Sequence, residues 1–135
     1  MNAVAGGLVG GPGDDTLTGT ASDEVIVGGL GNDLLTGGGG SDTFVYNSAD
    51  EGVDTITDFV VGVGGNKLDV SDVLVGFDPD DSNPYEFMMV DVDGTDTTVS
   101  VDADGPGTSY DFAPLATLQG ITVSDLGLLE DNLIF

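Results

Sequence analysis

Large apolar residues recur at every ninth position in the first third of the chain, at Leu17, Ile26, Leu35 and Phe44. An acidic residue stands two positions before each of them, and a glycine stands seven positions before. Residues 10–45 therefore divide into four contiguous nine-residue units. Six turn residues followed by three strand residues explain this spacing, because the middle residue of a short strand faces away from its neighbours. The pattern predicts stacked short strands with the recurring apolar residues in the core.

The sixth position of each unit is acidic, and these acids are Asp15, Glu24, Asp33 and Asp42. Two units make one coil of 18 residues, so Asp15 should stack on Asp33 and Glu24 on Asp42. Two carboxylates about 5 Å apart repel by roughly 3 kcal/mol at an effective dielectric of about 20. A Ca²⁺ ion between them would lie about 2.4 Å from each, which is an ordinary Ca–O distance. The repulsive stack is thus expected to become a pair of metal ligands.

Two further expectations concern residues around these units. Leu8 fits the apolar register of one more unit upstream. The outward-facing residues Val25, Val27 and Leu34 are expected to be covered by the C-terminal half.

The nonapeptide G-G-x-G-x-D-x-U-x is the signature of a calcium-binding parallel β-helix repeat, and residues 10–45 resemble the repeats-in-toxin (RTX) family. The resemblance implies a right-handed parallel β-roll whose turns bind Ca²⁺ through acidic side chains and backbone carbonyls. It assigns one ligand set to Gly11, Gly13, Asp15, Gly28, Leu30 and Asp33. It assigns a second set to Thr20, Ser22, Glu24, Gly37, Gly39 and Asp42.

The second of these sets departs from the family pattern in two ways. Glu24 is one methylene longer than the usual aspartate, so this site should be looser or should bind the ion with both carboxylate oxygens. Thr20 stands where glycine is usual, which makes the turn less permissive. The alternative for all four turns is that they are ordinary polar turns on a solvated face.

The polar and apolar residues of Asp54–Phe59 alternate, which predicts a strand. Residues 66–74 are expected to form a short strand and a helical turn with Ser71 as its N-cap. Both segments resemble the element that closes RTX rolls in secreted proteases, lipases and adhesins. The resemblance assigns a capping Ca²⁺ to Asp54 and Asp58, with Asn66 in place of an aspartate. The alternative is that these acids are exposed on an amphipathic strand.

The last third has no nonapeptide repeat, and turn residues such as Asp93-Gly94 separate its apolar runs. The predicted strands or edges cover residues 85–90, 97–101, 112–118 and 120–123, and a helix-like turn is predicted at 126–130. Residues 94–105, 115–122 and 125–135 resemble the C-terminal target domain of type I secretion. The resemblance places the export signal at Asp125, Leu126, Leu128, Leu129, Leu133, Ile134 and Phe135. The alternative is that this tail is a last strand packed on the roll.

Charge and composition exclude several classes of function. The chain carries 25 acidic residues and a single cation, Lys67, for a formal net charge of −24. One cation cannot neutralise a phosphate backbone, so nucleic-acid binding is not expected. The absence of Cys and His excludes thiol chemistry and imidazole catalysis. The chain contains no run of about 18 apolar residues, so no membrane span is predicted. The first residues do not resemble a Sec signal peptide.

These patterns predict an all-β protein: a parallel β-roll at residues 1–54, continued by a mostly antiparallel capping and signal region at residues 55–135. The expected function is non-enzymatic. The domain would bind two to four Ca²⁺ ions, direct export through a type I ABC transporter and its adaptor, and fold outside a bacterial cell, either secreted or held at the surface. It would cap passenger domains upstream in the same chain. The alternative is a Ca²⁺-dependent adhesin or polysaccharide-binding module.

Overall fold

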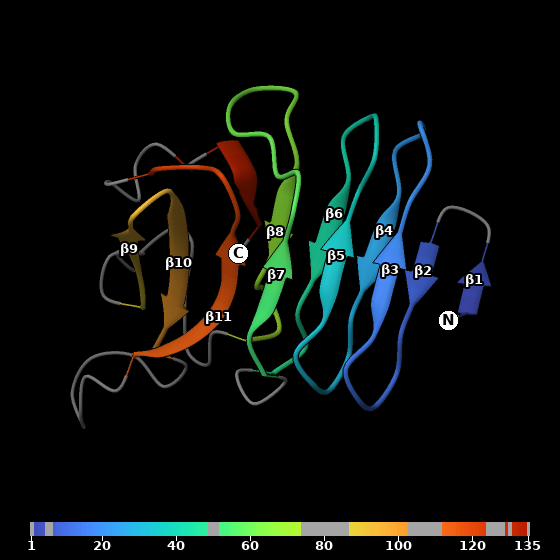
Figure 1. The fold of residues 1–135 in the computed structure, drawn as a ribbon, viewed down its shortest axis with the longest axis horizontal. Coiled ribbons are helices and arrows are strands. Elements are labelled where there is room, and N and C mark those ends of the chain that lie inside the picture. Colours follow the sequence, from blue (N-terminus) through green and yellow to red (C-terminus); the bar gives the residue numbers. More distant parts are fainter. Residues whose placement is uncertain are drawn as a thin grey trace.

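The computed structural model describes residues 2–4, 7–48, 52–73, 87–102, 112–123, 129 and 131–134. These residues form twelve strands in two six-stranded sheets, and the strands of the roll follow one another along the long axis of the molecule (Figure 1). The strands are β1 (Asn2–Val4), β2 (Gly7–Val9), β3 (Thr16–Thr18), β4 (Val25–Val27), β5 (Leu34–Thr36), β6 (Thr43–Val45), β7 (Asp54–Ile56), β8 (Lys67–Asp69), β9 (Met88–Asp93), β10 (Asp96–Val101), β11 (Ala113–Leu118) and β12 (Leu133–Ile134).

From β2 to β8 the chain alternates between the two sheets, so that strands two apart in sequence pair in parallel. The sheet orders are β1-β2-β4-β6-β8-β12 and β3-β5-β7-β11-β10-β9. Leu17 pairs with Leu35, and Ile26 pairs with Phe44, as the nine-residue period predicts. The parallel β-roll and the all-β class are therefore confirmed.

The core of the roll is a column of apolar side chains between the sheets. One residue from the middle or end of each roll strand points inward: Leu8, Leu17, Ile26, Leu35, Phe44, Ile56 and Leu68. All except Leu8 are at most 1% exposed. Burial of each large side chain stabilises the fold by about 1.5–3 kcal/mol. Leu8 pairs with Ile26, which confirms the additional upstream unit.

The roll continues past residue 45, where the nonapeptide repeats end. Strands β7 and β8 add another coil, and the Phe59 ring packs 6.2 Å from that of Phe44. Both sheets therefore run on through the predicted domain boundary, which falls inside β7. Strand β1, which the repeat pattern did not predict, pairs antiparallel with β2 at the other end of the roll.

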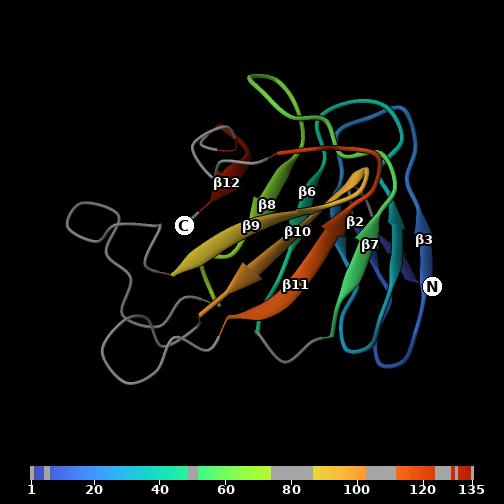
Figure 2. The same ribbon diagram turned by 60° about the vertical axis from the view of Figure 1, so that its left-hand side comes forward.

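The C-terminal region extends both sheets from their ends (Figures 1 and 2). Strand β11 pairs in parallel with β7 and antiparallel with β10, which pairs antiparallel with β9. Strand β12 pairs in parallel with β8. Because this region extends the sheets, it does not cover their outer faces. The expected covering is wrong: Val25 remains 45% exposed and Leu34 42% exposed.

Two local predictions are also wrong. Residues 120–123 are not a strand, because the Thr97 hydroxyl donates to the Ile121 carbonyl (2.6 Å) and accepts the Val123 N–H (2.8 Å), in place of a strand partner. Ser71 does not cap a helix: Asp69 accepts the Ser71 N–H at 3.1 Å, and residues 71–73 form a turn. Of the predicted helix-like turn at 126–130, only Leu129 lies within the described residues. No helix in the described part of the chain is long and apolar enough to span a membrane.

Candidate metal sites on the two edges of the roll

The glycine-rich turns form two opposite edges of the roll (Figure 1). Turns 10–15 and 28–33, with the residues that lead into β7, lie on one edge, which we call edge 1. Turns 19–24, 37–42 and 57–66 lie on the opposite edge, which we call edge 2. Successive turns on one edge belong to successive layers of the roll, so residues at equal positions come together.

On edge 1, three aspartates form a column. Asp33 Oδ1 accepts the Asp15 N–H at 2.8 Å, and Asp54 Oδ1 accepts the Asp33 N–H at 2.9 Å. The predicted stacking of Asp15 on Asp33 is confirmed, and Asp54 adds a third member. Each carboxylate thus holds the backbone of the layer before it.

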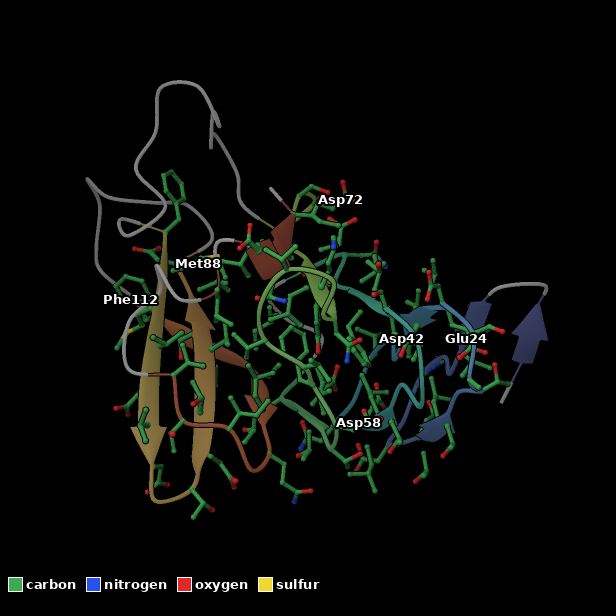
Figure 3. All side chains as sticks on the ribbon, turned by 90° about the horizontal axis from the view of Figure 1, so that it is seen from above. Glu24, Asp42, Asp58, Asp72, Met88 and Phe112 are labelled. Carbon is green, nitrogen blue, oxygen red and sulfur yellow. The ribbon has the colours of Figure 1, made fainter. Side chains whose placement is uncertain are left out.

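Edge 2 carries the equivalent column (Figure 3). Asp42 Oδ1 accepts the Glu24 N–H at 3.0 Å, and Asn66 Oδ1 accepts the Asp42 N–H at 3.0 Å. The predicted stacking of Glu24 on Asp42 is also confirmed. The third member here is a neutral amide, so edge 2 has one charge fewer in its column than edge 1.

The second carboxylate oxygens of Asp15, Asp33 and Asp42 are buried and have no hydrogen-bond partner in the described structure. Asp33 is 2% exposed and Asp42 is fully buried. A buried charged oxygen without a partner is costly, and native structures usually provide one. A hard cation such as Ca²⁺ would be an appropriate partner for oxygen atoms of this kind.

Backbone carbonyls face the same positions as these carboxylates. A methyl group placed on Gly10 would lie 2.5 Å from the Gly28 carbonyl oxygen and 2.7 Å from Asp15 Oδ2. On edge 2, a methyl on Gly19 would meet the Gly37 carbonyl oxygen and Glu24 Oε1. Beside Gly10 and Gly19, the carboxylate of the same turn therefore converges with a carbonyl of the next layer. A side chain at either glycine would fill the space.

The remaining predicted carbonyl donors lie in the same turns. The carbonyl oxygens of Gly11 and Gly13 face Gly29 and Gly31 in the next layer, and the Thr20 carbonyl accepts the Gly39 N–H at 2.8 Å. Ser22 lies against Gly40 in the next layer. Leu30 is 54% exposed in its turn. Among the described residues, no three acidic side chains are grouped closely enough to hold a metal ion by themselves, so a metal ion here would require these carbonyls to complete its shell.

The structure does not bring Asp54 and Asp58 together. Asp54 belongs to the edge 1 column, whereas Asp58 lies on edge 2, where it accepts the Gly37 N–H (2.9 Å) and the Gly38 N–H (2.8 Å). Asn66 is on the side of Asp58, because its Nδ2 donates to the Asp58 carbonyl at 3.3 Å. The two acids therefore cannot be described as one capping pair.

The pKa of Asp42 is raised to about 6, chiefly by burial and also by the neighbouring charges of Glu24, Asp58 and Asp23, against the opposing effect of the Glu24 N–H. Burial likewise raises the pKa of Asp33, with contributions from Asp15 and Asp14, while the Asp15 N–H lowers it. Both shifts reflect negative charge that is held out of water without a counter-charge.

A second set of interlayer contacts was not recognised from the sequence. Asp14 Oδ1 accepts the Asn32 N–H at 2.8 Å, Asn32 Oδ1 accepts the Val53 N–H at 2.9 Å, and Asp23 Oδ1 accepts the Ser41 N–H at 2.7 Å. These side chains occupy the fifth position of their units and bind the following layer, whereas the sixth-position acids Asp33 and Asp42 bind the preceding one. The signal was available, since all four fifth positions are short and polar.

Comparison with known proteins agrees with this geometry. Residues 9–44 and 18–56 match the RTX calcium-binding nonapeptide repeat, in 4 copies. The chain is similar to the solution structure of the AlgE6R3 subunit from the Azotobacter vinelandii mannuronan C5-epimerase, with 27% identity and a TM-score of 0.52, over 92% of this chain and 79% of that chain. No curated protein matches the chain. The repeats form an RTX β-roll, and RTX nonapeptide repeats bind Ca²⁺.

Proposed function

We propose that this chain is a non-catalytic domain that binds two to four Ca²⁺ ions between the layers of its roll and depends on them to fold. The observation that carries the proposal is the set of buried carboxylate oxygens without partners on Asp15, Asp33 and Asp42. Bound Ca²⁺ would supply positive charge that these oxygens lack. The carboxylates and the Gly28 carbonyl, which converges with Asp15 Oδ2, would hold it.

The energetic scale fits a folding switch. Extracellular calcium modules bind with dissociation constants of roughly 10⁻⁴ to 10⁻³ M. At a tenfold excess over the dissociation constant, each ion adds about 1.4 kcal/mol. Two to four ions would therefore add about 3–6 kcal/mol, which is comparable with the stability of a whole small domain. Without the ions, a net charge of −24 opposes compaction.

Circular dichroism and thermal unfolding of the full chain test this proposal. In millimolar CaCl₂ we expect a β-sheet spectrum and a cooperative transition, and in excess chelator we expect a weaker β-sheet signal and a transition at a much lower temperature. Magnesium at the same concentration serves as the control for ionic strength and should not restore folding. A chain that is equally folded and equally stable in chelator would refute the proposal.

We further propose that the C-terminal tail directs export of the unfolded chain through a type I secretion system, and that the chain folds outside a bacterial cell. Two features support this. The tail resembles type I target domains. In the folded state Leu129 is fully buried, and Leu133 and Ile134 occupy β12 beside β8, so a signal made of these residues would be accessible only before folding. Asp125, Leu126, Leu128 and Phe135 lie outside the described residues.

Co-expression with a type I exporter tests the export step. We expect the double substitution Leu133→Asp/Ile134→Asp to abolish appearance of the chain in the medium. Val9→Asp, an exposed strand position at the other end of the roll, is the matched control and should be exported normally. Export of the tail variant at the control level would refute the signal.

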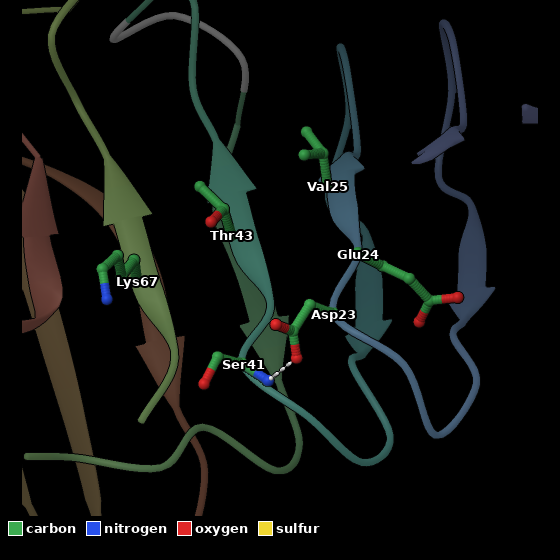
Figure 4. Close-up of a pocket in the computed structure, with 6 residues that line it drawn as sticks. All are labelled: Asp23, Glu24, Val25, Ser41, Thr43 and Lys67. Carbon is green, nitrogen blue, oxygen red and sulfur yellow. Dashed lines mark hydrogen bonds between the residues drawn. The ribbon is translucent and has the colours of Figure 1, made fainter. Parts of the chain in front are cut away.

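A second candidate function is calcium-dependent binding of an anionic polysaccharide. It is favoured by the similarity to a subunit of a mannuronan epimerase. A shallow pocket of about 340 Å³ on the outer face of β4, β6 and β8 offers hydroxyl, carboxylate and ammonium groups from Asp23, Ser41, Thr43 and Lys67 (Figure 4). Mannuronan binding by isothermal titration in CaCl₂, lost in Lys67→Ala and retained in Val60→Ala, would establish it. Absence of binding by the unsubstituted chain would exclude it.

A further inference from the structure

Glu24 differs from the three aspartates that share its position in the repeat. Both of its carboxylate oxygens are engaged within its own turn: Oε1 accepts the Thr20 N–H at 2.7 Å, and Oε2 accepts the Thr20 hydroxyl at 2.8 Å. Its side chain extends away from Asp23 and Ser41, which face the next layer (Figure 4). Asp15, by contrast, keeps a buried oxygen without a partner. The extra methylene lets Glu24 reach back to Thr20.

The backbone of turn 19–24 differs as well. In the other three turns the second and fourth positions are glycines with φ between 80° and 119°: Gly11, Gly13, Gly29, Gly31, Gly38 and Gly40. Turn 19–24 has Thr20 and Ser22 at these positions, and no non-glycine residue in the described structure has a positive φ. Side-chain bonds close this turn instead, since the Thr20 hydroxyl also accepts the Ser22 N–H at 3.2 Å. Turn 19–24 is therefore closed by side-chain hydrogen bonds, whereas the other three turns use glycines with positive φ.

The different turn also engages a backbone oxygen that the ion would need. The Thr20 carbonyl accepts the Gly39 N–H at 2.8 Å. On edge 1 the equivalent bond, from Leu30 to Gly11, does not form among the described residues. Three oxygens assigned to the first edge 2 site, two from Glu24 and one from Thr20, thus already hold protein donors. A calcium ion would have to displace these bonds before it could bind.

We propose that Thr20 and Glu24 close turn 19–24 in place of a calcium ion, so that the site between turns 19–24 and 37–42 is not a functional calcium site while its counterpart on edge 1 is. This inference rests on the proposed calcium binding of the roll. The roll then has one self-closed turn among metal-dependent ones. Asp42 retains its unpartnered oxygen, which faces Gly37 in its own turn, so the proposal concerns only the site built on Glu24.

Native mass spectrometry and isothermal titration with CaCl₂ test the proposal on the full chain. The matched pair is Asp15→Asn and Glu24→Gln, which remove the same charge at the same repeat position. Asp15→Asn should lose one bound ion and raise the half-saturating calcium concentration about tenfold or more. Glu24→Gln should keep the ion count and change half-saturation by less than about twofold, because glutamine can still bond to Thr20.

The second test looks for a gain of calcium binding. A variant that simply failed to fold could not produce such a gain. The triple substitution Thr20→Gly/Ser22→Gly/Glu24→Asp restores the repeat pattern in turn 19–24. We expect it to bind one ion more than the unsubstituted chain. An unchanged ion count in the triple variant, or loss of an ion in Glu24→Gln, would overturn the inference. Failure of the proposed function itself would be recognised separately, because the unsubstituted chain would then bind no calcium.

Discussion

The roll and the antiparallel region at its C-terminal end are stabilised in different ways. Roll strands are mostly three residues long, and each contributes one fully buried side chain to the column. Strands β9, β10 and β11 are six residues long, and β10 alone buries Val99 and Val101 beside Thr97. The roll compensates for its thin core with side-chain bonds between layers and with sites suited to metal. The antiparallel region relies on apolar burial, so it should depend less on calcium.

Removal of calcium should produce the largest effect on this comparison. We expect chelation to cost the roll about 3–6 kcal/mol. Amide hydrogen exchange should therefore accelerate far more in β3–β8 than in β10 and β11. The control is the same amide hydrogen-exchange measurement with MgCl₂ added in place of chelator. Equal acceleration in both regions would show that roll and antiparallel region unfold as one unit.

A cavity in the antiparallel region should have the next largest effect. Leu115 is fully buried in β11, and Leu115→Ala should lower the free energy of unfolding by about 2–5 kcal/mol. The number of bound calcium ions should not change, because Leu115 is a core residue and belongs to neither assigned ligand set. Leu34→Ala, at a 42% exposed roll position, is the control and should change stability by less than about 0.5 kcal/mol. Loss of bound calcium ions in the Leu115 variant would contradict the conclusion that calcium binding does not depend on the core of the antiparallel region.

Asn132 directly precedes β12 and bonds to turn 57–66 of the roll, and its substitution should have an intermediate effect. Its side chain is fully buried, its Oδ1 accepts the Gly62 N–H at 2.8 Å, and its Nδ2 donates to the Asn66 carbonyl at 2.7 Å. Asn132→Ala should cost about 1–3 kcal/mol, because buried backbone groups of turn 57–66 lose their partner. Urea unfolding in CaCl₂ measures this, with the exposed Gln119→Ala as control. A cost within experimental error would mean that water replaces the amide.

The smallest effect concerns pH. The raised pKa of Asp42, about 6, means that the calcium-free folded state binds its proton more tightly than the unfolded state. This contribution to stability is complete below about pH 4, the ordinary aspartate pKa, and is lost as the pH rises through about 6. In calcium-free buffer the melting temperature should therefore rise between pH 7 and pH 5. In CaCl₂ it should fall, because the ion requires the carboxylate. Asp42→Asn should reduce both trends, and parallel trends in the two buffers would contradict the assignment.

The parts that were predicted correctly depend on local repetition. Strands β3, β4, β5 and β6 occupy the last three positions of their repeats, as the nine-residue period requires. Turn and strand alternate there at fixed intervals, so one register determines all the others. Stacking of acids 18 residues apart follows directly from that register.

The parts that were not predicted depend on contacts between distant residues. The third layer uses spacings of 21 residues, from Asp33 to Asp54, and 24 residues, from Asp42 to Asn66. The nine-residue period does not extend to this layer, so nothing in the sequence showed that Asp54 and Asp58 belong to opposite edges. Asn132 acts on turn 57–66 from at least 66 residues away. The engagement of Glu24 by Thr20 required side-chain geometry, although both residues had already been noticed as departures from the repeat.

The unequal layer spacings have a practical consequence for protein engineering. The sixth-position side chain, rather than the number of residues in the turn, aligns each new strand with the one before, since Asp54 holds Asp33 as Asp33 holds Asp15. Peptide inserts placed ahead of that residue should bulge into solvent and leave the strand column undisturbed. The turns are thus natural grafting points for foreign loops.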